Sequence, residues 1–380
     1  MALKNVSCTL FKLFALSVFF IVMVSINAHG RDGGTKSAPP SAAAKTDPNE
    51  WKKVIEAAKK EGKIVIAGVP GEGWRRSMVD LFQQEYPEIK VEYSPTPGRI
   101  MLPRIRQERE MGKKLWDLST GGVGTTVAMK REGFFAPLRP LLLPEIADGG
   151  KWIGGINGLF SDIEKISMLS YLLYIRPSVY VNRDFIKASD LESSEQLLDQ
   201  KFRGKIVILN PTGGSSRQSL SHLAFMYGDN FLRTLLSKQD VIVTDDNRQQ
   251  VEWVVRGKYP IAVGFSLTLL IPFEKQGLGK NVTNLEDKII GTTSGSGVLS
   301  LFEGAPHPNA AKVYINWLLS QKTQARVAKN IEHNSRRIDV PPVETAVDPA
   351  KFSKYHSSDT EEGEEFTAHC DPIIKEALRR

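Results

Sequence analysis

Cysteine is scarce in this chain, which has only 2 among 380 residues, Cys8 and Cys370. Two cysteines form at most one bridge, and Cys8 lies in an N-terminal segment that we expect to be removed. The mature protein is therefore predicted to have no internal disulfide, so its stability must come from a hydrophobic core. Apolar residues make up 41% of the chain, which is ample for such a core, and the length suggests two domains.

The sequence also lacks the short motifs of common catalytic and nucleotide-binding sites. It has no Gly-x-Ser-x-Gly elbow, no His-Glu-x-x-His pair, and no Gly-Lys followed by Ser or Thr. His222 follows Ser215 and Ser219 on one expected helix, but a hydrolytic triad needs a base that an acid orients, usually from a separate element. No cluster has metal-ligand spacing. We therefore predict no catalytic residue, no metal and no cofactor, with an exported hydrolase as the weaker alternative.

Charge of one sign is nowhere concentrated. The chain has 50 Lys and Arg against 43 Asp and Glu, a net charge of +7, and loss of the first 30 residues with their two lysines leaves +5. A nucleic-acid-binding protein would gather its basic residues on one face. The mild surplus instead permits a small anionic ligand, and we expect a monomer that does not bind nucleic acid.

Only one long apolar run is present, Leu13–Val24, and Lys4 and Lys12 precede it. Small and polar residues up to Ala28 and Gly30 follow, which is the layout of a secretory signal peptide. The run is shorter than the roughly 20 residues that span a membrane. We expect cleavage near residue 30 and a periplasmic mature protein, with an uncleaved anchor as the alternative.

Both ends of the chain are expected to lie outside the folded core. Residues 31–49 are rich in Gly, Pro, Ser and Ala, so we interpret them as a flexible leader. Residues 346–380 contain Glu361, Glu362, Glu364 and Glu365, and we expect a solvated C-terminal tail there.

Between these ends, strand-like and helix-like segments alternate. The runs Lys63–Val69 and Leu115–Ser119 are typical of strands, and the spacing of apolar residues around them predicts intervening helices. A second cycle of the same kind begins at Lys205–Leu209. Such β-α-β-α order indicates an α/β protein with parallel sheets covered by helices on both faces.

Two long extended runs, Ile166–Val181 and Lys288–Leu301, separate the cycles. We interpret them as crossover strands between two doubly wound lobes, with a hinge at the crossings. The predicted first lobe comprises residues 50–167 and 295–345, and the second comprises residues 168–294.

In open parallel sheets, ligands bind at the loops that leave the carboxyl ends of the strands. The segment Asn210–Arg217 is the strongest candidate, because its two glycines let a ligand approach the backbone and its serines stand at a helix start that suits an oxyanion. Arginine adds a planar fork for carboxylates or phosphates. The predicted ligand-binding residues are Glu72, Gly73, Gly121, Gly122, Arg176, Thr212, Gly213, Gly214, Ser215, Ser216, Arg217, Ser266 and Thr268.

Three segments resemble a known family: EGFFAPL at 132–138, FRGKIVILNPTGGSS at 202–216, and HPNAAKVYINWLLSQKTQ at 307–324. They are similar to the periplasmic solute-binding proteins of ABC transporters, of the family 1 or iron(III) type, with the type II two-lobe fold. The resemblance covers roughly residues 50–345. It implies a protein that traps a small solute by hinge closure and delivers it to a membrane permease.

The resemblance leaves the solute open. Family members that hold ferric iron typically use two adjacent tyrosines, but the aligned segment Gly264–Pro272 contains no tyrosine, and no two tyrosines adjoin anywhere in the sequence. We therefore favour an organic or phosphorylated anion over ferric iron. A sensor that presents its ligand to a receptor is a further alternative, since it would use the same fold.

Overall fold

The protein is described by a computed structural model that covers residues 46–212, 214–265, 267–343, 347–348, 351 and 354–379. The predicted signal peptide, most of the predicted leader, Gly213 and Ser266 lie outside these residues. Among the described residues, no helix is both long enough and apolar enough to cross a membrane.

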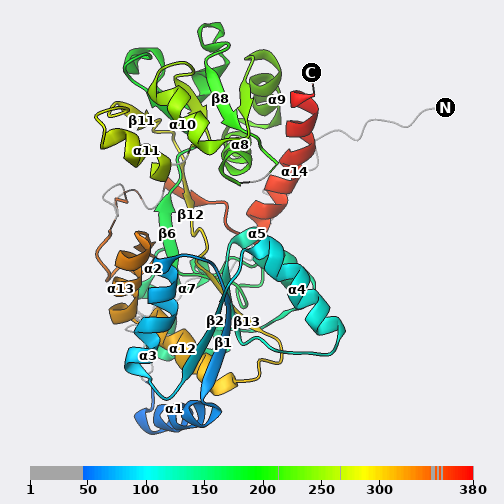
Figure 1. The fold of residues 1–380 in the computed structure, drawn as a ribbon, viewed down its shortest axis with the longest axis vertical. Coiled ribbons are helices and arrows are strands. Elements are labelled where there is room, and N and C mark those ends of the chain that lie inside the picture. Colours follow the sequence, from blue (N-terminus) through cyan, green and yellow to red (C-terminus); the bar gives the residue numbers. More distant parts are fainter. Residues whose placement is uncertain are drawn as a thin grey trace, which may run out of the picture. The chain divides into compact units, whose positions relative to one another are not determined.

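The first lobe is built on a six-stranded sheet (Figure 1). The strands run in the order β2-β1-β3-β13-β4, and β5 also pairs with β13. β1 is parallel to β2 and β3, whereas β13 is antiparallel to β3, β4 and β5. The strands are β1 (Lys63–Gly68), β2 (Lys90–Pro95), β3 (Leu118–Gly121), β4 (Phe135–Ala136), β5 (Leu169–Ser170) and β13 (Val298–Phe302).

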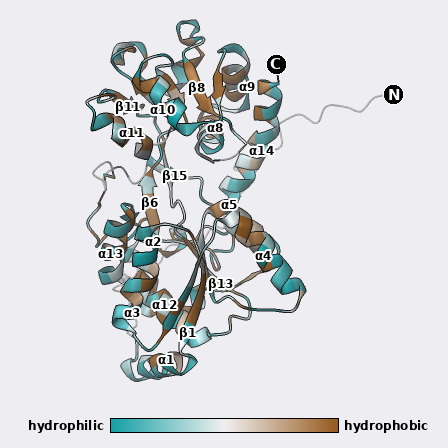
Figure 2. Cartoon of the chain, viewed as in Figure 1, coloured by the Kyte–Doolittle hydropathy of each residue, from teal (hydrophilic) through white to brown (hydrophobic). Residues whose placement is uncertain are grey.

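Helices cover this sheet and bury its apolar side chains. The first of them, α1, begins after Asp47, whose side chain accepts a hydrogen bond from the Asn49 N–H, and ends at Gly62 with φ 73°. Figure 2 shows hydrophobic residues concentrated along the strands and on the helices around them. The helices are α1 (Pro48–Glu61), α2 (Glu72–Arg75) with a π-turn (Arg76–Asp80) and α3 (Leu81–Glu85), α4 (Gly98–Glu110), α5 (Val123–Arg131), α6 (Pro144–Ala147), α7 (Gly155–Gly158), α12 (Pro308–Leu319) and α13 (Gln321–Ile331).

The second lobe is built on a five-stranded sheet in the order β11-β7-β10-β8-β9. β8 is parallel to β9 and β10, and β7 is antiparallel to β10 and β11. The strands are β7 (Val179–Asn182), β8 (Ile206–Leu209), β9 (Ile242–Thr244), β10 (Ile261–Val263) and β11 (Val282–Asn284). The helices are α8 (Gly214–Tyr227), α9 (Asp229–Lys238), α10 (Asn247–Val255) and α11 (Leu267–Glu274).

A third, smaller sheet holds the segments that connect the lobes. Its order is β14-β6-β12-β15, formed by Asn334–Ser335, Leu172–Ile175, Ile290–Thr293 and Tyr355–Ser357. The run 166–181 supplies β5, β6 and β7, which belong to three different sheets, and the run 288–301 supplies β12 and β13. The α/β architecture with two crossovers agrees with the prediction, while the exact lobe limits stay a prediction.

The C-terminal segment differs from the solvated tail that its acidic residues suggested. Residues Glu361–Leu378 form a helix, α14, which Thr360 caps by accepting a hydrogen bond from the Gly363 N–H. Cys370, Ile373 and Ile374 are buried in the core of the second lobe. The acidic residues of the first turn stabilise this helix because they face the positive end of its dipole. The expectation of a solvated tail is therefore wrong for residues 361–378.

Candidate functional site

A cavity of about 370 Å³ lies in the first lobe, where β1 and β3 end. Parallel strands place their following loops at the same sheet edge, which is the usual position of a ligand site in such sheets. Six hydroxyl side chains and one indole line it, and its lining contains no charged side chain. The lining residues are Ala67, Gly68, Val69, Pro70, Trp74, Thr96, Pro97, Gly98, Met101, Ser119, Thr120, Gly121, Gly122, Thr125, Thr126, Met129 and Ser296.

The first turn of α5 forms one wall of this cavity. Gly122 occupies the N-cap position, and no side chain caps the helix. The first backbone hydrogen bond of the helix joins the Thr126 N–H to the Gly122 carbonyl at 3.2 Å, so the preceding amides have no partner within the helix. Uncapped N–H groups at the positive end of a helix dipole favour an anion.

Three of the six hydroxyls that line the cavity, those of Thr96, Thr120 and Thr126, already form hydrogen bonds within the protein. Thr120 Oγ1 donates to the Ser296 carbonyl at 2.9 Å, and Thr126 Oγ1 donates to the Gly122 carbonyl at 3.0 Å. Ser119 also lines the cavity and is only 5% exposed. Ser119 is therefore one candidate contact for a solute in this cavity.

A tyrosine holds the loop after β1 in place. Tyr93 accepts a hydrogen bond from the Val69 N–H at 2.9 Å and donates to the Val69 carbonyl at 2.8 Å. Its ring lies so close to Gly68 that a Cβ there would be 2.2 Å from ring atoms. Burial raises the pKa of Tyr93, so the phenol stays neutral. The half-buried Trp74 packs against the core and also lines the cavity.

The structure brings only two of the predicted first-lobe residues to this cavity, Gly121 and Gly122. Glu72 is exposed and pairs with Arg76 Nη2 at 2.8 Å. Gly73 packs against α13, since a Cβ there would lie 2.2 Å from the Asn330 carbonyl oxygen. Glu72 and Gly73 thus lie outside the lining and stay untested as ligand contacts.

In the second lobe, the loop after β8 joins α8 by hydrogen bonds of its serines. Ser216 is fully buried, and its hydroxyl donates to the Val263 carbonyl at 3.1 Å and accepts from the Leu209 N–H at 3.0 Å. Ser215 donates to the Gly264 carbonyl at 3.2 Å. Thr212 is exposed beside α14. Gly214 begins α8, and Thr268 lies in α11.

Gly264 determines how closely β10 approaches α8, and its replacement should destabilise the protein. Its φ is 72°, and a Cβ would lie 2.3 Å from Ser216 Cα. We expect Gly264→Ala to lower the free energy of unfolding by about 2 kcal/mol, measured by urea titration. Gly277→Ala is the matched control, because Gly277 has φ 83° but open space around it. Equal losses in both variants would contradict the steric explanation.

The predicted ligand contact Arg217 is held by two carboxylates of α14. Its Nε and Nη2 bind the two carboxylate oxygens of Asp371 at 2.7 and 2.9 Å, and its Nη1 lies 3.2 Å from Glu364 Oε1. The hydrogen bond to Asp371 raises the pKa of Arg217 above the ordinary value of an arginine. A solute that uses Arg217 would have to share or displace these carboxylates.

Arg176 stands on the first crossover. Its Nη2 donates to Thr293 Oγ1 at 3.0 Å and to the Tyr174 hydroxyl at 3.3 Å. Thr293 Oγ1 in turn donates to the buried Asp359 at 2.5 Å. Arg176 Nη1 is buried without a hydrogen-bond partner among the described residues, so this guanidinium keeps one free donor.

Other cavities have a different chemistry. One of about 470 Å³ lies beside β12 and is lined by His222, Glu286, Asp287 and Asp348, among others. Another, of about 360 Å³, contains Arg336, whose pKa burial lowers to about 10. Of these three cavities, only the one in the first lobe lies at the carboxyl ends of strands and beside an uncapped helix start. It is therefore our candidate site.

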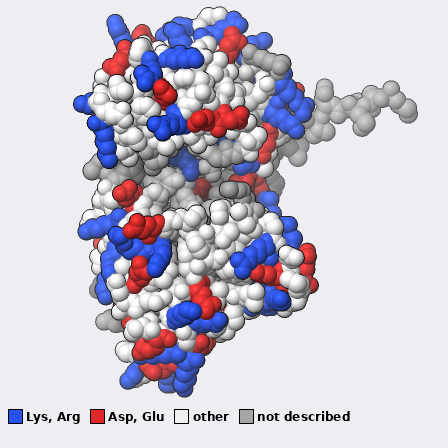
Figure 3. Space-filling model, in the orientation of Figure 1, with Lys and Arg blue, Asp and Glu red and all other residues white. Residues whose placement is uncertain are grey.

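On the visible face, basic and acidic side chains are interspersed (Figure 3).

Comparison with known proteins supplies the family context. Residues 44–325 match the model of a family described as bacterial extracellular solute-binding protein. No curated protein matches the chain.

Solved structures share the fold at low sequence identity. A Trichodesmium FutA, in complex with iron and citrate, is 15% identical with a TM-score of 0.66, and the match covers 84% of this chain and 100% of that one. Iron-bound HitA from Pseudomonas aeruginosa is 14% identical (TM-score 0.62; 83% and 99% covered). AfuA from Actinobacillus pleuropneumoniae, with fructose-6-phosphate bound, is 17% identical (TM-score 0.55; 83% and 99% covered). At these identities the likeness shows the fold, that of type II periplasmic binding proteins.

Proposed function

Because this chain belongs to the bacterial extracellular solute-binding protein family, we propose that it captures a small organic anion in the periplasm and delivers it to an ABC permease. Members of the family bind small solutes and work with such permeases. The observation that carries the choice of an anion is the uncapped start of α5 in the wall of the first-lobe cavity.

The lining of that cavity favours a particular kind of anion. It offers backbone N–H groups and neutral hydroxyls but no charged side chain. Such donors suit a carboxylate or phosphate that carries further hydroxyl groups, because each hydroxyl needs its own partner once it leaves water. The indole of Trp74 would cover an apolar part of the solute. Citrate and fructose-6-phosphate, named with two of the similar structures, belong to this class.

Capture is proposed to proceed by hinge closure about the third sheet. The solute would first meet the α5 start, and the second lobe would then add contacts from the predicted loop that contains Thr212, Ser215 and Arg217. Contacts to both lobes would stabilise the closed form. Arg176, on the first crossover, stays a proposed contact for the closed form, because its buried Nη1 has no hydrogen-bond partner among the described residues.

Ferric iron is the second candidate, because two of the similar structures are named with iron. Hard oxygen ligands such as carboxylates or phenolates would be needed for it. Among the described residues, no group of three or more His, Cys, Asp or Glu side chains is placed to hold a metal ion, and no phenol or carboxylate lines the candidate cavity. These observations support the anion over the metal.

A thermal-shift screen tests the proposal. A ligand present at about 1,000 times its dissociation constant should add about 4 kcal/mol to the free energy of unfolding. We expect stabilisation by citrate, by a sugar phosphate such as fructose-6-phosphate, or by a related hydroxylated anion. Neutral fructose is the matched control and should have no effect. Stabilisation by ferric iron without an organic anion would favour the second candidate, and steady hydrolysis of a compound would favour an enzyme.

A further inference from the structure

Helix α14 is part of the second lobe by its apolar packing. Cys370, Ile373 and Ile374 lie in the same hydrophobic cluster as strand residues of the second sheet, and all three are at most 3% exposed. The helix packs against α8 and α9 (Figure 1). Separating it from the second lobe would expose this apolar surface to water, so the two are expected to move together.

Ion pairs along the same helix strengthen that attachment. Asp371 receives two hydrogen bonds from Arg217 of α8, with the side chain of Arg217 only 16% exposed. Nearer the C-terminus, Glu376 lies 3.0 Å from Arg233 of α9. A planar guanidinium that binds both carboxylate oxygens fixes direction as well as distance.

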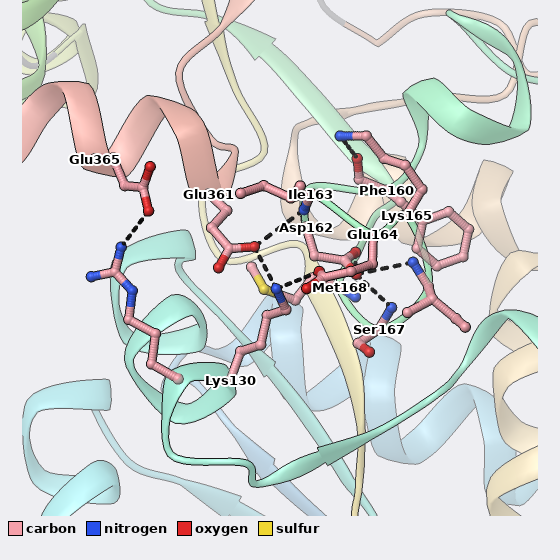
Figure 4. A network of polar contacts seen from close by, with 12 residues as sticks. Lys130, Phe160, Asp162, Ile163, Glu164, Lys165, Ser167, Met168, Glu361 and Glu365 are labelled. Carbon is pink, nitrogen blue, oxygen red and sulfur yellow. Dashed lines mark hydrogen bonds and ion pairs between the residues drawn. The ribbon is translucent and has the colours of Figure 1, made fainter.

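The first turn of α14, in contrast, contacts the first lobe. Glu361 Oε2 lies 2.5 Å from Lys130 Nζ at the end of α5, and these side chains are 8% and 16% exposed. The same oxygen accepts the Ile163 N–H at 3.1 Å, and the Glu361 N–H donates to the Ser161 carbonyl at 2.8 Å. Figure 4 shows Glu361 pointing from α14 toward Lys130. One turn further, Glu365 pairs with Arg131 at 3.0 Å.

The segment of the first lobe that receives α14 is itself held firmly. Asp162 is fully buried, and its carboxylate accepts the N–H groups of Ile166, Ser167 and Met168, each at 3.0 Å (Figure 4). Lys130 Nζ also binds Glu164 of this segment at 2.5 Å. The loop of residues 161–168 is therefore held in one conformation by its own hydrogen bonds, and the first turn of α14 binds to it.

We propose that α14 is a latch between the lobes, carried by the second lobe and fastened to the first by Glu361 and Glu365. It adds a third connection to the two crossovers, and it lies beyond the residues that match the family model. This inference rests on the proposed function, because it assumes that the two lobes move about a hinge. The apolar contacts of α14 stay with the second lobe, so the charged contacts of its first turn are the ones that a hinge movement must release.

The latch can be tested on the full-length protein without any ligand. In Lys130→Met/Glu361→Gln both charges are removed together, so no unpaired buried charge remains. We expect amide exchange in residues 161–168 and 361–365 to accelerate by about tenfold, with no change in residues 370–376. We also expect the radius of gyration from small-angle scattering to rise, because the lobes sample a wider range of arrangements.

The double variant Arg233→Met/Glu376→Gln is the matched control, because it removes an ion pair of α14 that stays within the second lobe. It should leave both the exchange of residues 161–168 and the radius of gyration unchanged. If Lys130→Met/Glu361→Gln does not fold, Arg131→Gln/Glu365→Gln removes the exposed pair instead, and we expect about threefold faster exchange in the same segments.

Two results would overturn the proposal. One is an unchanged radius of gyration and unchanged exchange in whichever latch variant folds. The other is equal acceleration along all of α14, which would mean that the helix leaves the second lobe as a unit. Because no ligand is present, either result leaves the proposal of an anionic solute standing, and failure of the ligand screen leaves the latch standing.

Discussion

Replacing Gly121 with isoleucine should lower the affinity for the solute by at least about 100-fold, or about 2.7 kcal/mol. A Cβ at Gly121 would meet nothing closer than Thr126 Oγ1 at 3.9 Å, and both residues line the cavity. The backbone of Gly121 is not among the residues with positive φ, and β-branched side chains suit a strand. The new side chain is therefore expected to fill the site while the fold persists. Isothermal titration with the anion identified in the screen measures the loss.

The variant Gly121→Ala is the control for this change. It adds a single methyl group at the same position, so we expect affinity within about tenfold of the wild type and an unchanged midpoint of thermal unfolding. If Gly121→Ile binds the solute as tightly as the wild type, the solute does not occupy the first-lobe cavity. The cavity beside β12, with its acidic lining, would then be the next candidate.

Acidification should destabilise the protein through His222. Burial lowers the pKa of His222 from 6.5 to about 4 in the folded state, and its side chain is 7% exposed. Below pH 6.5 the His222 side chain binds a proton in the unfolded chain but not in the folded protein. The stability that is present above pH 6.5 is therefore lost as the pH falls toward 4. The full effect is about 3 kcal/mol, of which about 2 kcal/mol is lost by pH 5.

Urea unfolding at pH 7 and at pH 5 checks this prediction. We expect His222→Phe, whose ring keeps the stacking on Phe225, to lose about 2 kcal/mol less than the wild type over that interval. An identical pH dependence in His222→Phe and the wild type would count against the buried histidine as the cause.

The sequence was sufficient for the fold class and the family, and both predictions are confirmed. The reason is physical: alternating strand and helix patterns require crossover connections, and two long extended runs had no place in either cycle. Residues 166–181 and 288–301 indeed supply strands to more than one sheet. The finer predictions about signal-peptide cleavage concern residues outside those described.

The site was harder to predict, because it depends on which loops the fold brings together. Gly121 and Gly122 were found from their position after a strand, and both line the cavity. The hydroxyls of Thr96 and Ser296 were missed, although Thr96 directly follows β2; Ser296 lies in the turn between β12 and β13. A parallel sheet edge collects such side chains from distant segments, and only the three-dimensional arrangement reveals them.

Arg217 shows why a residue type alone does not identify a ligand contact. The predicted loop suggested a free guanidinium, but Asp371 and Glu364 reach it from a helix about 150 positions later in the chain. The same helix was expected to be a solvated tail because of its acidic start. The apolar spacing of Phe366, Cys370, Ile373 and Ile374 was the signal that could have identified it.

A crystal structure of the protein with its bound solute tests the central claim most directly. We predict that an acidic group of the solute accepts hydrogen bonds from the backbone amides at the start of α5, between Gly122 and Thr125, with Ser119 close to it. A solute bound elsewhere, or a metal ion held by protein side chains without an organic anion, would contradict the account.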